Sequence, residues 1–123
     1  MSTSKLLKQL KSIVGPKYVT EEICDWLVYS KDYSIEGIAD DYTPDLVVRP
    51  GSVEEIEKIV GVANEFEVPL NTWGAGTSMS GNPLAVHHGI VLDTKRMNQV
   101  LEVDSENLTI TVQAGVTRAG TSL

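Results

Sequence analysis

The chain has 123 residues, of which 41% are hydrophobic, with a formal net charge of −7 and one cysteine, Cys24. This length supports one modest core and argues against a second one. The negative charge argues against a non-specific nucleic-acid binder, and no run reaches the ~18 apolar residues of a membrane span. A lone cysteine excludes an internal disulfide, and with few histidines it argues against a structural metal site. We expect a cytoplasmic chain.

Residues 1–43 are expected to form an N-terminal helical segment. Apolar side chains recur at helical spacing from Leu6 to Val14, and Gly15-Pro16 ends that pattern. Thr20 is predicted to be the N-cap of a second, short helix, because two glutamates follow it in the favourable first turn. From Tyr29 onward the periodicity is lost, so the end of this segment is interpreted as a solvated connection.

A second segment, residues 44–123, begins with a strand, a helix and another strand. Leu46-Val47-Val48 is a short apolar run typical of a buried strand, and Val68 to Trp73 resembles another. Between them, Ser52 and Glu55 form a capping box at the start of a helix. This order, at these lengths, predicts a right-handed βαβ unit with parallel strands. The expected apolar face of the helix consists of Val53, Ile56, Ile59, Val60 and Ala63.

The remaining elements are predicted to be strands. Gly89 to Asp93 is a short apolar strand, and residues 100–103 and 108–112 bracket a polar turn, which indicates an antiparallel hairpin. Together, the elements predict an α+β fold with an α/β-like βαβ core, N-terminal helices and a β-hairpin. The hairpin side chains expected to point inward are Leu108, Ile110 and Val112.

The glycine-rich segment from Trp73 to Asn82 is the most informative stretch. It contains three glycines, three hydroxyl side chains and no charge. Glycine permits close approach of a ligand, successive backbone N–H groups form an anion-binding concavity, and hydroxyls add donors without bulk. The segment follows a predicted parallel strand, and open α/β sheets bind ligands at the carboxyl ends of such strands. These features predict a cradle for a diphosphate.

Two common nucleotide motifs do not match this segment. The dinucleotide fingerprint G-x-G-x-x-G requires glycine where this chain has Met79. Gly76 and Gly81 have the spacing of a Walker A loop, but Asn82-Pro83 follows in place of Lys-Ser/Thr, which argues against a phosphotransfer enzyme. Two alternatives stay open: an ordinary glycine-rich surface loop, and a non-catalytic nucleotide-binding module that regulates a partner.

The segments of residues 44–123, taken together, resemble one known family. The chain is similar to the FAD-linked oxidases of the vanillyl-alcohol oxidase / p-cresol methylhydroxylase type, and most of all to the branch of the glycolate oxidase D-subunit and the D-lactate dehydrogenases. The similarity extends over residues 29–123. The segments that carry it are Pro44–Pro50, the helix after Ser52, Gly74–Gly81, Gly89–Asp93 and Gln113–Val116.

The resemblance implies the first lobe of a p-cresol methylhydroxylase-type FAD-binding domain. FAD is expected to be non-covalent, because Thr77 occupies the region where some members carry a flavin-linking histidine. The implied reaction of the full-length protein is oxidation of a small 2-hydroxy acid of the glycolate or D-lactate type. A homo-oligomer is a further expectation. The residues expected to bind FAD are Pro50, Trp73, Gly74, Ala75, Gly76, Thr77, Ser78, Ser80, Gly81, Asn82, Ala114, Gly115 and Val116.

The resemblance also bears on what this chain does alone. Family members continue with a second lobe and a substrate domain, which hold most of the substrate-binding and acid/base residues. No catalytic residue is therefore assigned here, and the chain is expected to be an N-terminal fragment that is inactive by itself. Half a flavin site supplies diphosphate contacts but does not enclose the reactive ring, so FAD binding by this chain is expected to be weak.

Overall fold

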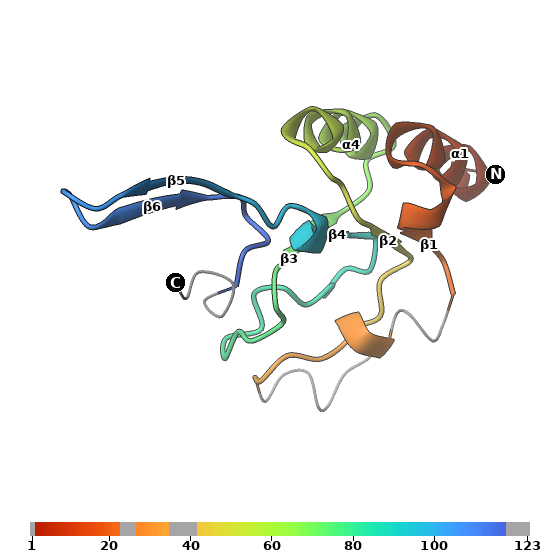
Figure 1. Cartoon of the computed structure of the whole chain (residues 1–123). Helices are drawn as coiled ribbons and strands as arrows, with labels where there is room; N and C mark the ends of the chain where they lie inside the picture. The colour runs from red at the N-terminus through yellow and green to blue at the C-terminus, as the bar shows by residue number, and fades with distance from the viewer. Residues whose placement is uncertain (1, 23–26, 35–41, 118–123) are drawn as a thin grey trace.

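The computed structural model describes residues 2–22, 27–34 and 42–117. Its fold is α+β. Two helices lie side by side over one face of a small sheet, and a separate two-stranded hairpin projects to one side, away from the sheet and the helices (Figure 1). In chain order the elements, with η marking a short 3-10 helix, are α1 (Ser2–Val14), η1 (Pro16–Tyr18), β1 (Val19–Thr20), β2 (Leu46–Val48), α4 (Val53–Glu65), β3 (Leu70–Trp73), β4 (Ile90–Asp93), η2 (Thr94–Arg96), β5 (Val100–Asp104) and β6 (Thr109–Val112).

The main sheet has four strands in the order β1-β2-β4-β3. β4 runs parallel to both of its neighbours, with Val91 opposite Val47 on one side and Asn71 on the other. The predicted strand–helix–strand unit is therefore present with parallel strands, but β4 is inserted between β2 and β3, which makes it a split βαβ unit. β1 pairs antiparallel with β2 at the edge of the sheet. The sequence did not predict β1, because two residues are too few to carry a periodic pattern.

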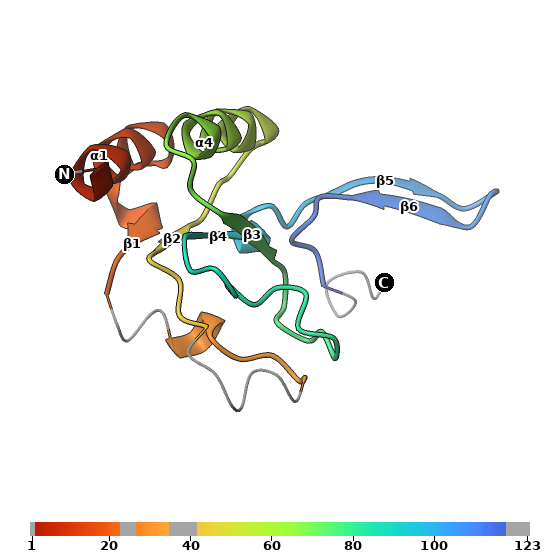
Figure 2. The same ribbon diagram turned by 180° about the vertical axis from the view of Figure 1, so that it is seen from behind.

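The two faces of the sheet bury separate hydrophobic clusters, because successive side chains of a strand point to opposite faces. Val47 and Val91 point away from the helices and pack with Tyr29, Trp73 and Ala85. The helices cover the opposite face, and the loops of residues 27–34 and 74–89 lie on the side away from them, as the view from behind also shows (Figure 2). The buried cluster beneath the helices consists of Leu6, Leu10, Val14, Val19, Leu46, Val48, Ile59, Ala63, Ile90 and Leu92.

Helix α4 begins with the predicted cap. The Glu55 N–H donates to Ser52 Oγ at 3.2 Å, so Ser52 is the N-cap. The reciprocal bond of the capping box is displaced by one residue, because Glu55 Oε2 accepts the N–H of Gly51 at 2.7 Å rather than that of Ser52. The bond to Ser52 satisfies a donor of the first turn that the helix leaves unpaired, and the bond to Glu55 satisfies the N–H of Gly51 just before the N-cap.

The predicted apolar face of α4 is wrong at two positions. Ile59 and Ala63 are buried as expected, but Val53 and Val60 are 58% and 40% exposed. The reason is that α4 packs against both the sheet and α1. This arrangement rotates the buried stripe, so the partly buried positions packed on the core are Ile56, Val62 and Phe66.

The N-terminal segment contains the first predicted helix but departs from the second prediction. The first helix ends at Val14, and the following Gly15 adopts φ 92 and donates its N–H to Lys11 O at 3.0 Å. Thr20 belongs to β1 and residues 21–22 are not helical, so the predicted helix start is wrong there. Residues 27–29 are helical, whereas Ile23 to Trp26, which include Cys24, lie outside the described residues. Pairing with β2 draws Val19 and Thr20 into an extended conformation instead.

The predicted hairpin forms, but its predicted burial is wrong. β5 and β6 pair antiparallel, with Val103 opposite Ile110. Leu108, Ile110 and Val112, expected inside, are 90%, 41% and 36% exposed. The physical reason is visible in Figure 1, where the hairpin projects away from the sheet and the helices. Among the described residues, no helix has the length and apolar character needed to cross a bilayer.

Candidate functional site

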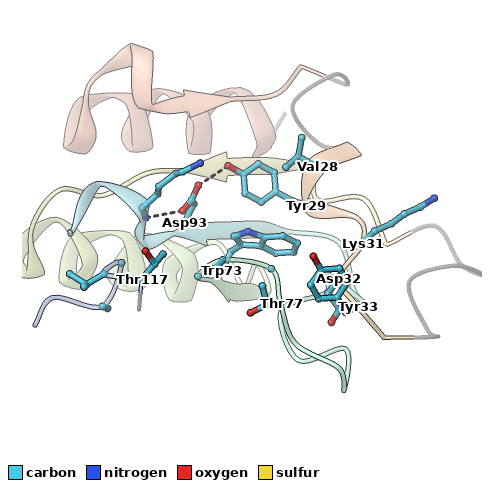
Figure 3. Close-up of a pocket in the computed structure, with 16 residues that line it drawn as sticks. Val28, Tyr29, Lys31, Asp32, Tyr33, Trp73, Thr77, Asp93 and Thr117 are labelled. Atoms are coloured by element: carbon cyan, nitrogen blue, oxygen red, sulfur yellow. Dashed lines mark hydrogen bonds between the residues drawn. The ribbon is translucent and has the colours of Figure 1, made fainter. Parts of the chain in front are cut away.

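A cavity of about 730 Å³ lies at the carboxyl ends of β3 and β4. Its lining comes from three parts of the chain: residues 28–33, the start of the glycine loop, and the end of β4 with residues 114–117 (Figure 3). The glycine loop is defined here as residues 74–82. The cavity has the volume of a small-molecule site, and it occupies the edge of the sheet at which α/β proteins bind ligands.

The glycine loop also borders a second, smaller hollow of about 200 Å³. Gly74 to Thr77 line both hollows, so this part of the backbone is reached from two sides. Ser78 and Asn82 line the smaller hollow only. A ligand that spans the loop would therefore meet main-chain atoms in one hollow and side-chain hydroxyl and amide groups in the other.

Backbone donors in the first half of the glycine loop are available to a ligand. The N–H groups of residues 74–77 donate no hydrogen bond to another described residue. The charged side chains that line the larger cavity are Lys31, Lys95, Asp32 and Asp93, whose formal charges cancel. Side chains thus supply no net positive charge for an anion, and the unpaired N–H groups are the donors that suit one.

Trp73 holds the glycine loop in place at Gly76. Gly76 has φ +69, and a Cβ at this position would collide with Cζ2 of the buried indole and lie 3.0 Å from its Cε2. Both the backbone conformation and the close approach require glycine here. The other side of the indole meets Tyr29 edge-on, with ring centroids 5.1 Å apart at 71°. Trp73 therefore supports the loop and also lines the larger cavity, and its role as a ligand residue stays a prediction.

A buried carboxylate forms the cavity wall at the end of β4. Asp93 Oδ2 accepts the Tyr29 hydroxyl at 2.7 Å, and Arg49 Nε lies 3.8 Å from the same oxygen. Asp93 Oδ1 accepts the Lys95 N–H at 2.8 Å, which caps η2. Burial, together with the hydrogen bond to Asp93, raises the pKa of Tyr29 to about 12, so the phenol stays neutral at physiological pH. This cluster joins the N-terminal segment firmly to the sheet.

The turn at Ala114–Val116 packs against η2. The Gly115 N–H donates to Met97 O at 2.8 Å, and Thr94 Oγ1 lies 3.3 Å from both Trp73 O and Ala114 O. A Cβ on Gly115 would collide with Thr94 O, so the turn approaches η2 more closely than any other residue type permits. This contact brings the chain after the hairpin back to the cavity.

The structure brings most of the predicted ligand residues to the two hollows. Pro50 is fully buried and lines neither hollow, and Ser80 and Gly81 lie in the distal part of the loop, also outside both linings. Sequence reasoning missed Tyr29 and Asp93, which are 64 residues apart and share no local pattern. The predicted residues that line the larger cavity are Trp73, Gly74, Ala75, Gly76, Thr77, Ala114, Gly115 and Val116, and those that line the smaller one include Ser78 and Asn82.

The described residues contain no group of three or more His, Cys, Asp or Glu placed to hold a metal ion. The backbone donors and the volume of the site suit an organic anion.

Comparison with known proteins identifies the family. Residues 44–120 match a family model described as an FAD binding domain. The chain is 38% identical to glycolate oxidase subunit GlcD of Bacillus subtilis (strain 168) over 94% of its own length, and it covers 24% of that protein. It is 32% identical to D-lactate dehydrogenase of Anaerostipes hadrus over 93% of its own length, and it covers 23% of that protein.

Solved structures agree with the fold. p-Cresol methylhydroxylase, determined with its substrate bound, superimposes with a TM-score of 0.82 at 26% sequence identity, over 94% of this chain and 23% of that one. The chain thus spans about a quarter of the length of the relatives it matches. The predicted family resemblance and fold class are confirmed. The chain belongs to the FAD binding domain family, and its cofactor is FAD.

Proposed function

We propose that this chain supplies the diphosphate-binding part of an FAD site in an oxidoreductase. The observation that carries the proposal is that residues 74–77 line both hollows and that their backbone N–H groups donate no hydrogen bond to another described residue. A diphosphate placed there would gain several hydrogen bonds without displacing internal ones. Ser78 and Asn82 would add side-chain donors from the smaller hollow.

We further propose that the flavin is held without a covalent bond. Thr77 lines both hollows, and neither His87 nor His88 lines either of them. His88 is instead held by Thr43, with its Nδ1 2.8 Å from Thr43 O. The described residues around the larger cavity include no histidine or cysteine to which a flavin ring would be linked.

The proposed activity of the full-length protein is oxidation of a 2-hydroxy acid of the glycolate or D-lactate type, in the cytoplasm. Support comes from the names of the relatives, a glycolate oxidase subunit and a D-lactate dehydrogenase. FAD, when bound, supplies the hydride-accepting chemistry. This chain's own part is to bind and orient the nucleotide, and we assign it no catalytic residue. We propose that it does not turn over alone, since it spans about a quarter of its relatives.

The activity is tested on the full-length flavoprotein. Under anaerobic conditions, glycolate or D-lactate is added and the visible absorbance of the flavin is followed, with L-lactate as the control of opposite configuration. We expect one of the first two acids to bleach the flavin faster than L-lactate does. A protein that binds FAD but is bleached by none of the three would contradict the 2-hydroxy-acid assignment and favour a non-catalytic nucleotide-binding module.

A further inference from the structure

The segment of residues 29–34 lines the larger cavity through Tyr29, Lys31, Asp32 and Tyr33, and it is hydrogen-bonded to the glycine loop. We call this segment the clasp. It precedes the part of the chain that matches the FAD binding domain model, which begins at residue 44. One end of the clasp is fixed to the sheet by the hydrogen bond from Tyr29 to Asp93. Its middle approaches the distal half of the glycine loop, where the Tyr33 N–H donates to Ser78 O at 3.0 Å.

Asp32 precedes Tyr33 in the clasp and stabilises the turn that follows it. Its Oδ1 accepts both the N–H of Ser34 at 2.8 Å and the Ser34 hydroxyl at 2.5 Å, which fixes the turn of the clasp. Its Oδ2 is shielded from solvent and has no hydrogen-bond partner among the described residues. Desolvation raises the pKa of Asp32, but the hydrogen bonds from Ser34 outweigh it, and the pKa is lowered.

The distal half of the glycine loop has little other support. Ser80 N–H donates to Ser78 Oγ at 3.2 Å, which is a contact within the loop, and Met79 is exposed. Among the described residues, the hydrogen bond that connects residues 78–81 to a distant segment is the one from the Tyr33 N–H to Ser78 O. A glycine-rich loop loses much backbone entropy when it is ordered, so its conformation depends on such external contacts.

We propose that the clasp, through Asp32 and Tyr33, positions the glycine loop and so holds the N–H groups of residues 74–77 ready for the FAD diphosphate. Asp32 is a positioning residue in this proposal, not a ligand residue. Preorganisation of the loop removes part of the ordering cost that binding would otherwise carry. The effect on FAD affinity rests on the proposed function, whereas the effect on the loop itself does not.

The test compares Asp32→Ala with a matched control, Asp104→Ala. Asp104 Oδ1 likewise accepts two hydrogen bonds, here from the backbone N–H groups of Glu106 and Asn107, but it lies in the hairpin turn away from the cavity. In D32A we expect backbone NMR order parameters at residues 78–81 to fall from about 0.85 to below about 0.6, and FAD affinity to fall about tenfold. In D104A we expect neither quantity to change.

Asp32→Asn is the second variant, because it keeps an oxygen that accepts from Ser34 and removes the charge. We expect D32N to loosen the loop less than D32A does while the amide spectrum stays dispersed. Order parameters at residues 78–81 that match the wild type in both folded variants would overturn the proposal. If D32A loosens the loop and the wild type binds no FAD, the clasp stands and the proposed function fails.

Discussion

Gly76 lies directly against the indole of Trp73, at a separation that leaves no room for a Cβ. The indole is buried at the end of β3, so its position is set by the sheet and by the edge-on ring of Tyr29. The backbone conformation at the start of the glycine loop is therefore fixed by its packing against the core. This contact explains how a segment with so much backbone freedom is held in one conformation at its first turn.

Gly76→Ala should disrupt that first turn. The new methyl group would collide with the indole, and alanine is strained at φ +69, so we expect a loss of about 1–3 kcal/mol in the free energy of unfolding. Gly74→Ala is the matched control, because a Cβ at Gly74 meets nothing within 4 Å. We expect G74A to change stability by less than about 0.5 kcal/mol. Urea unfolding of both variants provides the measurement, and equal losses in the two would contradict the role of the indole.

Tyr29→Phe should weaken the attachment of the clasp to the sheet. The variant removes the hydroxyl that donates to the buried Asp93 at 2.7 Å, and hydrogen bonds to charged groups contribute about 1.5–3 kcal/mol. We expect a loss of that order in the free energy of unfolding. Tyr33→Phe removes the same atom from an exposed ring on the same segment and should be near neutral. If Y33F lowers the free energy of unfolding as much as Y29F does, the hydrogen bond to Asp93 is not the source of the loss.

The same hydroxyl predicts a pH dependence. Burial, with the bond to Asp93, raises the pKa of folded Tyr29 to about 12 from its ordinary value of 10.0. The unfolded state therefore loses this proton first, and the stabilisation is complete below about pH 10 and lost as the pH rises to about 12. We expect stability to fall more steeply in the wild type than in Y29F over this range. Urea unfolding at each pH gives the measurement. If the free energy of unfolding falls equally with pH in the wild type and in Y29F, Tyr29 is not the source of the pH dependence.

The hairpin presents an apolar face created by a β-bulge. The register shifts between Val100 and Glu102, so Val100 and Val103 lie on the same face of the hairpin. On that face they pair across the strands with Val112 and Ile110, respectively. All four are exposed. Exposed apolar faces on paired strands favour association between copies.

We expect the double substitution Val103→Thr and Ile110→Thr to reduce self-association of the chain. Threonine keeps the β-branched shape that suits a strand, and neither residue belongs to a buried cluster, so the thermal midpoint should stay within a few degrees. Light scattering over a concentration series gives the measurement. Thr109→Ser with Thr111→Ser on the opposite face is the control and should leave association unchanged. A wild-type chain that stays monomeric throughout would contradict this prediction.

Local patterns predicted most of the elements but not how they are assembled. The spacing from Leu6 to Val14 and the cap at Ser52 determine two helices, and the apolar runs determine β2 and β4. The insertion of β4 between β2 and β3 depends on pairing between distant residues, which no local period records. The burial of the hairpin side chains was predicted wrongly for a different reason. Alternation of apolar residues identifies an apolar face, but burial of that face depends on what covers it.

In the candidate site, too, local patterns were predicted and contacts between distant segments were not. Residues 74–77 were predicted because glycine and hydroxyl side chains concentrate in one short stretch. The bonds from Tyr29 to Asp93 and from Tyr33 to Ser78 were missed, because each joins segments far apart in the chain. Pro50 was predicted to lie near the cofactor and is fully buried outside both hollows, so its place in the site stays a prediction.

The most direct test of the proposed diphosphate site is an NMR titration of the ¹⁵N-labelled chain with FAD and, in parallel, with riboflavin, which has the flavin ring but no phosphates. We predict weak binding of FAD, with a Kd on the order of 1 mM. The amide signals of Gly74 to Thr77 should shift with FAD and stay in place with riboflavin. Equal shifts with both ligands, or FAD-induced shifts that leave residues 74–77 unaffected, would contradict the account.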